Sequence, residues 1–406
     1  MDNHRVYLKS LTLKDVGPFS DLTVEINPGP GLNLICGGNG IGKTTILEAV
    51  VACFSQGRNH KLKRRQSAER GSVHLQYLAD DESRVINLNI ENFDPEKGDF
   101  SNYQNGLGEN IVNVRAFRDF SYMKQVGISS DPDFNQKEFG HRAANDPQPS
   151  EIKSWLTNRY LLRPHADKSS WSEEMKSNLI TAERIFSLLD ERVALSEVDV
   201  RTFDVMVSTP GGVIPFEFLS SGFRSAFSLL LGILKEIEFR KLEVAAENFS
   251  GVILIDEVDL HLHPTWQQQI GGILKKTFPR AQIIATTHSP HVVQAASPEE
   301  VIALVAEDDE RVKARSVPQS KFGYLGWTIE EVLEDIMGVE DTRTATFRAV
   351  MRAFDGAIEA EDEAKIRHAL ADLEEMLHPN NPLRKLLRIQ VAPFLTPDQP
   401  ENKKID

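Results

Sequence analysis

The sequence contains no long uninterrupted apolar run and only two cysteines, Cys36 and Cys53. Its longest apolar stretch, residues 226–234, includes a serine and has charged neighbours. It is far shorter than the roughly 20 residues that span a bilayer. The first ten residues carry charges where a secretory signal requires an apolar segment. Both cysteines lie in apolar sequence, which favours buried free thiols over a disulfide framework. We therefore expect a cytoplasmic protein without membrane contact.

An excess of positive charge is also missing, since the 406 residues carry a formal net charge of −14. This balance argues against a protein whose whole surface binds nucleic acid. Basic residues are nevertheless concentrated between Arg58 and Arg70, namely Arg58, Lys61, Lys63, Arg64, Arg65 and Arg70, with Glu69 as the one acid. The segment is either a solvated loop or a patch that contacts DNA or RNA phosphates. The absence of aromatic residues from it weakens the second interpretation.

Internal repeats, low-complexity tracts and long heptad patterns are absent as well. Alternating strand-like segments and helical apolar stripes instead predict a mixed α/β protein. We expect four regions: a β-rich part at 1–128, a helical lobe without a long coiled coil at 129–200, a second α/β part at 201–317, and a helical region at 318–406. The two apolar stripes of the last region are typical of a helical hairpin, and docking of a partner there is the alternative.

One glycine-rich segment fits the phosphate-loop pattern GxxxxGK[ST]: Gly37, Gly38, Asn39, Gly40, Ile41, Gly42, Lys43 and Thr44, followed by Thr45. A strand-like run precedes it and a helical run follows, so backbone N–H groups and a helix N-terminus are expected to converge on phosphates. Lys43 is then expected to contact the β- and γ-phosphates, and the Thr44 hydroxyl to bind magnesium. The pattern predicts ATP and Mg²⁺ as ligands.

Two acids follow the apolar run 252–255, at Asp256 and Glu257. A buried strand that ends in Asp256 places a carboxylate near the magnesium ion, as a Walker-B acid does. Glu257 is then the candidate base that activates the attacking water. Because these acids come after a phosphate loop, a catalytic role is favoured over a simple acidic turn.

A histidine, His288, follows a third apolar run at 283–285. Histidine just past a strand is often structural, but its place after the acid pair makes His288 the candidate sensor of the γ-phosphate. His261 and His263 have a metal-like spacing, yet Pro264 begins a helix directly after them. We therefore expect no metal site at these two histidines.

The fourth motif, Leu-Ser-Ser-Gly-Phe at 219–223, stands at the start of an apolar helix. Ser220 or Ser221 could simply cap that helix. In the order phosphate loop, this motif, acid pair and histidine, however, the chain resembles ABC-type ATPases of the SMC, RecF and OLD superfamily, whose signature is LSGGQ. The sequence departs from that signature at Ser221, where the family often has glycine, and at Phe223, where it often has glutamine.

The resemblance implies an ABC-ATPase head: a P-loop NTPase core sheet flanked by helices, with an antiparallel N-terminal β part, a short helical insertion and a C-terminal helical region. It implies slow ATP hydrolysis by Glu257 and His288, with Mg²⁺ on Thr44 and Asp256. It also implies a homodimer or higher oligomer in which Ser220 and Gly222 reach the ATP of the opposite protomer. Asp259 matches the loop at that seam. No glutamine marks the family's Q-loop, and Arg115 and Arg118 are the candidates for its region.

No nuclease motif accompanies these ATPase motifs. The acidic run 307–310 is not followed by the DxD pair of a Toprim domain, and His368 and His378 do not form an HNH motif. The run 255–263, the helical ending near Trp327 and the segment 377–380 resemble the Septu-type (PtuA-like) and retron-associated ATPases of anti-phage defence. That resemblance implies a separately encoded nuclease partner of HNH type. A RecF-like DNA-repair or DNA-binding ATPase and an ATP-locked oligomeric scaffold with slow turnover are the alternatives.

Overall fold

The computed structural model describes residues 5–55, 57–59, 61–101, 107–116, 122–128, 130–134, 136–143, 147–165, 171–240, 242–307, 311–318, 320–339 and 342–394. The chain forms two compact units, residues 1–339 and 340–406. Within the described ranges, no helix is long and apolar enough to span a membrane.

A six-stranded sheet lies at the centre of the first unit, in the order β15-β14-β3-β13-β12-β8. Its strands are β3 (Gly31–Gly37), β8 (Ile111–Val114), β12 (Val252–Ile255), β13 (Gln282–Thr286), β14 (Val301–Ala306) and β15 (Val312–Arg315). All are parallel except β15, which pairs antiparallel with β14. β12 and β13 are buried on both faces, which explains the uninterrupted apolar sequence of β12 and the apolar centre of β13. Parallel strands place their carboxyl ends at one edge, where the loops that follow can meet.

Antiparallel sheets make up the rest of the β structure. The largest has the order β2-β1-β5-β6, with β1 (Val6–Val16), β2 (Phe19–Glu25), β5 (Gly71–Ala79) and β6 (Glu82–Ile90). A three-stranded sheet contains β9 (Ala194–Val198), β10 (Val205–Thr209) and β11 (Gly212–Pro215), and a two-stranded one contains β4 (Gly57–Asn59) and β7 (Asp99–Ser101). Buried and partly exposed residues alternate along β5, as expected for a sheet with one face on the core.

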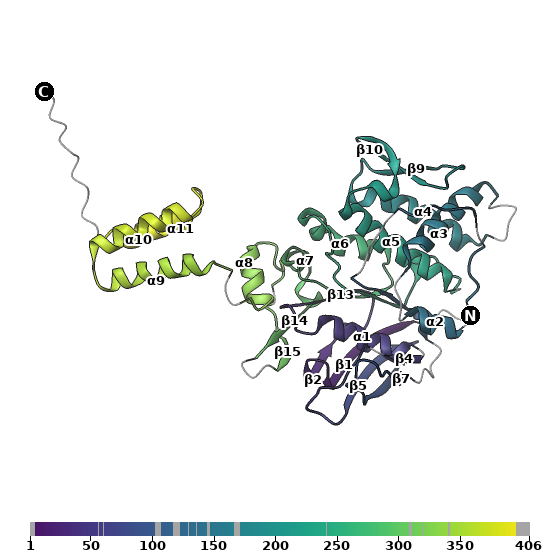
Figure 1. The fold of residues 1–406 in the computed structure, drawn as a ribbon, viewed down its shortest axis with the longest axis horizontal. Helices are drawn as coiled ribbons and strands as arrows, with labels where there is room; N and C mark the ends of the chain where they lie inside the picture. Colours follow the sequence, from purple (N-terminus) through teal and green to yellow (C-terminus); the bar gives the residue numbers. More distant parts are fainter. Residues whose placement is uncertain are drawn as a thin grey trace. The chain divides into compact units, whose positions relative to one another are not determined.

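The helices of this unit are α1 (Lys43–Phe54), α2 (Gln136–Ala143), α3 (Pro149–Leu162), α4 (Glu173–Leu189), α5 (Ser221–Phe239), α6 (Pro264–Thr277), α7 (Pro290–Ala295) and α8 (Ile329–Glu331), which continues as a π-helical turn at Val332–Ile336. α1 and the antiparallel β2-β1-β5-β6 sheet lie on one face of the central sheet, and α3, α4, α5 and α6 lie on the other (Figure 1). Along β12, Ile253 and Ile255 join one apolar cluster with α3, α4, α5 and α6, whereas Val252 and Leu254 join another with α1 and β1. This division follows the two-residue period of a strand.

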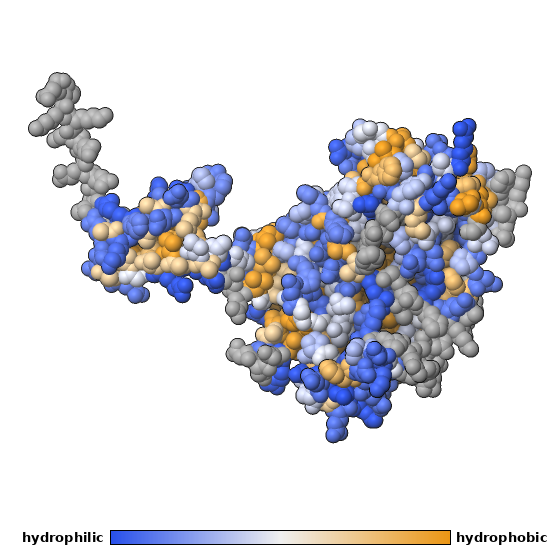
Figure 2. All heavy atoms as spheres, in the orientation of Figure 1, coloured by the Kyte–Doolittle hydropathy of each residue, from blue (hydrophilic) through white to orange (hydrophobic). Residues whose placement is uncertain are grey.

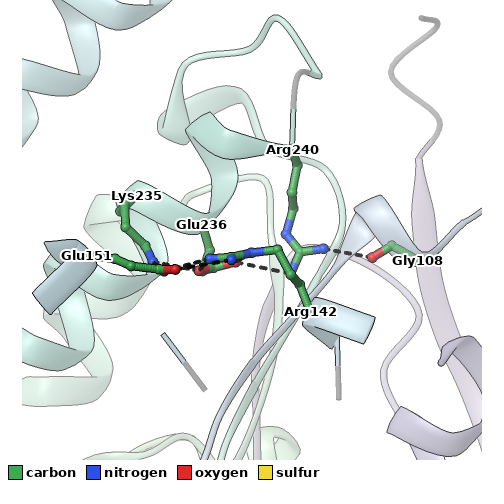
Figure 3. A network of polar contacts seen from close by, with 6 residues as sticks. All are labelled: Gly108, Arg142, Glu151, Lys235, Glu236 and Arg240. Atoms are coloured by element: carbon green, nitrogen blue, oxygen red, sulfur yellow. Dashed lines mark hydrogen bonds and ion pairs between the residues drawn. The ribbon is translucent and has the colours of Figure 1, made fainter. Parts of the chain in front are cut away.

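A buried network of charges ties α5 to α2, α3 and the segment before β8 (Figure 3). Its members are Gly108, Arg142, Glu151, Lys235, Glu236 and Arg240. Arg142 donates to both carboxylate oxygens of Glu236, and Lys235, which is 0% exposed, donates to Glu151. Burial alone would raise the pKa of Glu236, but the charges of Lys235 and Arg142 outweigh it and lower this pKa to about 2.

The described part of the second unit, residues 342–394, contains the helices α9 (Ala345–Glu359), α10 (Glu363–Met376) and α11 (Leu383–Val391). The side chains of Thr344 and Asp362 cap the first two helices. The core consists of Phe354, Ala357, Ile366, Ala369, Leu373, Leu387 and Val391. The face of this unit seen in Figure 2 carries apolar as well as hydrophilic residues, and Met376, Leu386 and Ile389 are exposed.

The fold class expected from the sequence is confirmed: a P-loop core sheet with flanking helices and an antiparallel N-terminal β part. The two apolar stripes near the C-terminus lie on α9 and α10 and pack together. A third helix, α11, completes their core and was not predicted. The edge strand β8 ends at Val114. At that point Val114 O accepts a hydrogen bond from Asp256 N, and Arg115 leaves the sheet.

Candidate functional site

The glycine-rich loop connects β3 to α1 and requires glycine at two positions. Gly37 and Gly42 have φ angles of +147° and +100°, which side chains rarely allow. A Cβ on Gly37 would lie 2.5 Å from Leu304 O, and one on Gly42 would lie 2.4 Å from Phe19 Cζ. No acidic residue lies in the first turn of α1. The positive end of the helix dipole is therefore available to an anion.

Lys43, the first residue of α1, folds back over this loop. Its Nζ donates to Gly37 O at 2.8 Å and to Gly38 O at 2.9 Å, and lies 3.3 Å from Nδ1 of His288. Burial lowers the pKa of Lys43, while the Cys36 thiol and nearby carboxylates oppose that effect. The ammonium group is thus held at the mouth of the loop by acceptors that a phosphate can replace.

Asp256 follows β12 and lies beside the hydroxyl of Thr44. Thr44 Oγ1 is 3.2 Å from Oδ1 and 3.0 Å from Oδ2 of Asp256. Thr286, the last residue of the neighbouring strand β13, donates to Oδ1 at 2.6 Å. The structure therefore joins the two residues expected to hold magnesium, and Thr286 orients the carboxylate.

Glu257 directly follows Asp256 and has a φ of +50°, a left-handed conformation that non-glycine residues seldom adopt. Its backbone N–H donates to Thr286 Oγ1 at 2.8 Å, and the next amide, Val258 N, donates to Thr286 O at 2.9 Å. These bonds to β13 fix the backbone at Glu257. Strained backbone that its surroundings hold in place is a feature of functional sites.

His288 lies after β13 in a loop that Asp259 organises. Asp259 Oδ1 accepts hydrogen bonds from Thr287 Oγ1 and from the backbone N–H of His288. Thr287 Oγ1 also accepts from Ser289 N at 3.0 Å. Within this chain Asp259 thus holds the histidine loop next to Lys43.

The signature motif opens α5, with Ser220 at the N-cap position. Ser220 is exposed and its side chain makes no capping hydrogen bond, so capping does not explain this serine. Gly222 is buried, and a Cβ there would lie 2.9 Å from Trp266 Cζ3 and 3.1 Å from His261 O. Gly222 therefore lies against the loop after Glu257. Hydrogen bonds and short contacts separately join a cluster that consists of Lys43, Thr44, Asp256, Asp259 and His288.

Arg115 follows β8 and forms a two-bonded ion pair with Glu48 on α1, at 2.9 Å and 3.1 Å. Glu48 lies one helical turn after Thr44, so the pair connects the end of β8 to the phosphate-loop helix. Lys61 also donates to Glu48. Arg118, the other candidate for this region, lies outside the described residues.

Several side chains of the basic segment donate hydrogen bonds to backbone oxygens of the same chain. Lys63 donates to Asp94 O and Lys97 O, and Arg64 donates to Glu91 O and Ala68 O. Arg65 donates to Pro18 O. These contacts give the segment a structural role.

The cluster fits a magnesium–nucleotide complex. The loop lacks Cβ atoms where backbone approaches closely, and the side chains beside it are an ammonium group, a hydroxyl and a carboxylate. Hydroxyl and carboxylate oxygens are ligands that Mg²⁺ prefers. His261 and His263 do not take part: His263 caps α6 by accepting from Thr265 N, and His261 has a φ of +62°.

Sequence reasoning missed the threonines of this site. Thr286 and Thr287 bridge the acids that follow β12 to the loop that follows β13. Their position directly before His288 could have predicted this contact, because neighbouring parallel strands end at the same edge of a sheet. Glu48 was missed too, since nothing in a helical stripe identifies its partner 67 residues away.

Comparisons with known proteins show the family of the chain. A family model described as "AAA domain, putative AbiEii toxin, Type IV TA system" matches residues 32–294. The chain is similar to the Septu protein PtuA of Bacillus thuringiensis, with 39% identity over 394 residues that cover 95% of this chain and 98% of that protein. It is also similar to the "Retron Vc95 probable ATPase" of Vibrio cholerae serotype O1 biovar El Tor, with 26% identity over 58% of this chain and 47% of that protein.

Solved structures with a related chain path include the SMC head domain from Thermotoga maritima. It is 16% identical, covers 77% of this chain and 99% of its own, and has a TM-score of 0.46. The recombination mediator protein RecF is 17% identical, with the same coverage and a TM-score of 0.39.

Proposed function

This chain belongs to the AAA-domain family that its residues 32–294 match and to the family of the Septu protein PtuA, and on that premise we propose that it hydrolyses ATP to control a separately encoded nuclease in anti-phage defence. The observation that carries the proposal is the cluster of Lys43, Thr44, Asp256 and His288 at the carboxyl edge of the central sheet. Its members come from three loops, and each supplies a group that phosphoryl transfer needs.

The phosphates of ATP bind in the loop 37–44, where Lys43 exchanges its contacts with Gly37 O and Gly38 O for β- and γ-phosphate oxygens. Thr44 and Asp256 would hold magnesium, which would neutralise negative charge on the phosphate oxygens. Thr286 keeps the Asp256 carboxylate turned toward Thr44.

An open cavity of about 660 Å³ flanks this loop and offers room for the rest of the nucleotide. It is lined by Gly17, Pro18, Lys63, Arg64, Arg65, Gln66, Ser67 and Phe93. Its wall is continuous with the phosphate loop, because Cβ atoms on Gly17 and Gly42 would meet Thr45 and Pro18 at 2.9 Å and 2.6 Å.

Hydrolysis requires a water molecule in line with the γ-phosphate and a base to take its proton. Glu257 accepts that proton as the water oxygen bonds to the γ-phosphorus and the bond to the β–γ bridging oxygen breaks. The products are ADP and inorganic phosphate. His288, held by Asp259 next to Lys43, donates a hydrogen bond to the γ-phosphate oxygens.

Two copies of the chain close around two ATP molecules in this proposal. Support comes from Ser220, whose exposed hydroxyl and α5 N-terminus suit contact with an anion. Within one copy, the neighbouring Gly222 packs against Trp266, while Lys43 of the phosphate loop lies beside His288. Contact of Ser220 with the nucleotide of a second copy is therefore proposed, and turnover is slow because it waits for that closure.

The partner is proposed to be an HNH-type nuclease in the cytoplasm, regulated by closure and opening of the heads. The second unit, with Met376, Leu386 and Ile389 exposed, is a candidate place for it to dock. Nucleic-acid contact through Arg58–Arg70 is less favoured, since Lys63, Arg64 and Arg65 already donate to carbonyl oxygens of the chain.

The test is a pull-down of the tagged chain from its native cells in ATP and magnesium, followed by mass spectrometry and an ATPase assay. A co-purifying nuclease, absent with the Lys43→Ala variant, supports the proposal. Recovery of repair proteins or DNA alone would favour a RecF-like role. An oligomer that ATP stabilises without phosphate release would favour a scaffold.

A further inference from the structure

Helix α6 begins where three parts of the proposed hydrolysis site meet. Its first residues follow the loop that starts at Glu257, and two neighbouring side chains of its first turn, Trp266 and Gln267, leave it in different directions. Trp266 reaches the signature motif, and Gln267 reaches the loop that carries His288. Both side chains are half-buried.

The Trp266 ring packs against the start of α5. Its centroid lies 4.4 Å from that of Phe223, and Gly222 leaves the space that the ring fills. Ser225 Oγ, one turn along α5, donates to Leu260 O at 2.8 Å. Phe223 stands where the signature pattern has glutamine, and here its ring fastens the signature to the loop after Glu257.

Gln267 bridges two loops with the two ends of one amide. Its Nε2 donates to Leu262 O at 2.9 Å, and its Oε1 accepts from Ser289 Oγ at 2.7 Å. Ser289 is 5% exposed and also accepts from the first amides of α7. Gln267 therefore adds a second side-chain link, besides Asp259, between the loop after Glu257 and the loop that carries His288.

We infer that Trp266 and Gln267 are positioning residues that join the signature motif, the Glu257 loop and the His288 loop into one body. The inference rests on the proposed ATPase function. When a nucleotide and a second copy draw in the signature, Trp266 transmits that displacement to the loop after Glu257, and Gln267 carries it to His288. The base and the γ-phosphate sensor then reach their working positions together.

The experiment compares Gln267→Met, Trp266→Ala and Trp266→Phe with the wild-type chain, and uses Gln269→Ala as a matched exposed control on the same helix. Steady-state hydrolysis gives kcat and KM, and a fluorescent ATP analogue gives the nucleotide Kd. Gln267→Met keeps the side-chain volume and removes both hydrogen bonds. It should lower kcat by ~10–100-fold, the cost of a small misplacement of catalytic groups.

The nucleotide Kd should stay within about threefold, because no described hydrogen bond or ring contact joins either residue to the phosphate loop. Trp266→Phe should recover most of the activity that Trp266→Ala loses. In a double-mutant cycle, Phe223→Ala should add little to Trp266→Ala, since both remove one contact. A merely structural role would instead lower the melting temperature and weaken nucleotide binding together with kcat.

An unchanged kcat in Gln267→Met, with Lys43→Ala inactive, would overturn the positioning role and leave the ATPase function standing. Wild-type turnover no higher than that of Lys43→Ala would instead overturn the proposed function itself, and the positioning role with it. The two failures are therefore distinguishable in one set of assays.

Discussion

The Nζ atom of Lys43 lies 3.3 Å from Nδ1 of His288, although 245 positions separate the two residues in the chain. The same ammonium group donates to two carbonyl oxygens of its own loop. Lysine and histidine thus meet at the point where the γ-phosphate of a nucleotide is expected. Binding of that phosphate would place an anion between two groups that can both donate hydrogen bonds.

Replacing His288 should impair hydrolysis more than binding. We expect His288→Ala to lower kcat by ~10²-fold, the loss that follows removal of one transition-state donor, with a nearly unchanged Kd for ATP. Lys43→Ala should abolish binding, because we propose that the lysine contacts the β- and γ-phosphates. Phosphate-release kinetics and nucleotide titration measure the two effects. A His288→Ala variant with full kcat would remove the histidine from the mechanism.

Glu257→Gln should trap ATP. The amide preserves the shape of the side chain but cannot accept the proton of water, so hydrolysis should fall ~10²–10⁴-fold. Because ATP then persists in the site, light scattering should detect a dimer that lasts in ATP and magnesium. Asp259→Asn is not a suitable control, since Asp259 holds His288; Glu247→Gln, a residue before β12, serves instead. Hydrolysis by Glu257→Gln at the wild-type rate would show that another group is the base.

The hydroxyl of Thr44 should control the magnesium requirement. Thr44→Ser keeps the hydroxyl 3.0 Å from Asp256, whereas Thr44→Val keeps the volume and removes it. We expect Thr44→Val to raise the Mg²⁺ concentration for half-maximal turnover by ~10-fold or more, the effect of about 1.4 kcal/mol in binding, and Thr44→Ser to change it little. EDTA should stop turnover in every variant. Equal magnesium curves for the two variants would contradict the assignment.

Acid should destabilise the first unit through Glu236. Because its pKa falls from 4.5 in the unfolded chain to about 2 in the fold, the stabilisation is fully present above pH ~4.5 and is lost as the pH falls toward 2. The shift corresponds to ~3 kcal/mol. Glu236→Gln should lower the free energy of unfolding at pH 7 by ~3 kcal/mol and weaken the pH dependence of unfolding in that window.

Denaturant unfolding at several pH values measures this effect, and Glu82→Gln is its control. Glu82 is exposed and pairs only with an exposed arginine in the described contacts, so its substitution should change stability by no more than about 0.5 kcal/mol. If Glu236→Gln unfolds with the same pH dependence as the wild type, the carboxylate does not carry the acid sensitivity.

The phosphate loop, the acid pair and His288 were predictable because each follows an apolar strand and is encoded by consecutive residues. Thr286 was not recognised, because its contact with Asp256 depends on the pairing of Ile255 with Ala285 in neighbouring strands. That pairing is a property of the folded sheet. The sequence names the residue types of the site, and the strand order determines which of them meet.

Buried charge was harder still to predict. The run 222–239 reads as one apolar helix, yet it contains Lys235 and Glu236, both almost completely buried. Their partners Arg142 and Glu151 lie on α2 and α3, and no local pattern connects them. A buried charge is tolerated only when distant segments neutralise it, so its presence in a sequence indicates that partners exist without saying where.

The two buried free cysteines can report local opening of the structure through their reaction with alkylating reagents. Cys36 lies on β3, one residue before the phosphate loop, and burial raises its pKa to about 12; burial also raises the pKa of Cys53 on α1. The thiolate is the nucleophile that attacks an alkylating reagent, and both sulfurs are buried, so we expect modification at neutral pH to be slow until the strand or helix that carries the cysteine opens. The alkylation rate of Cys36 therefore reports local opening of the strand that leads into the phosphate loop. A bound nucleotide should lower this rate, and the measurement needs no engineered label.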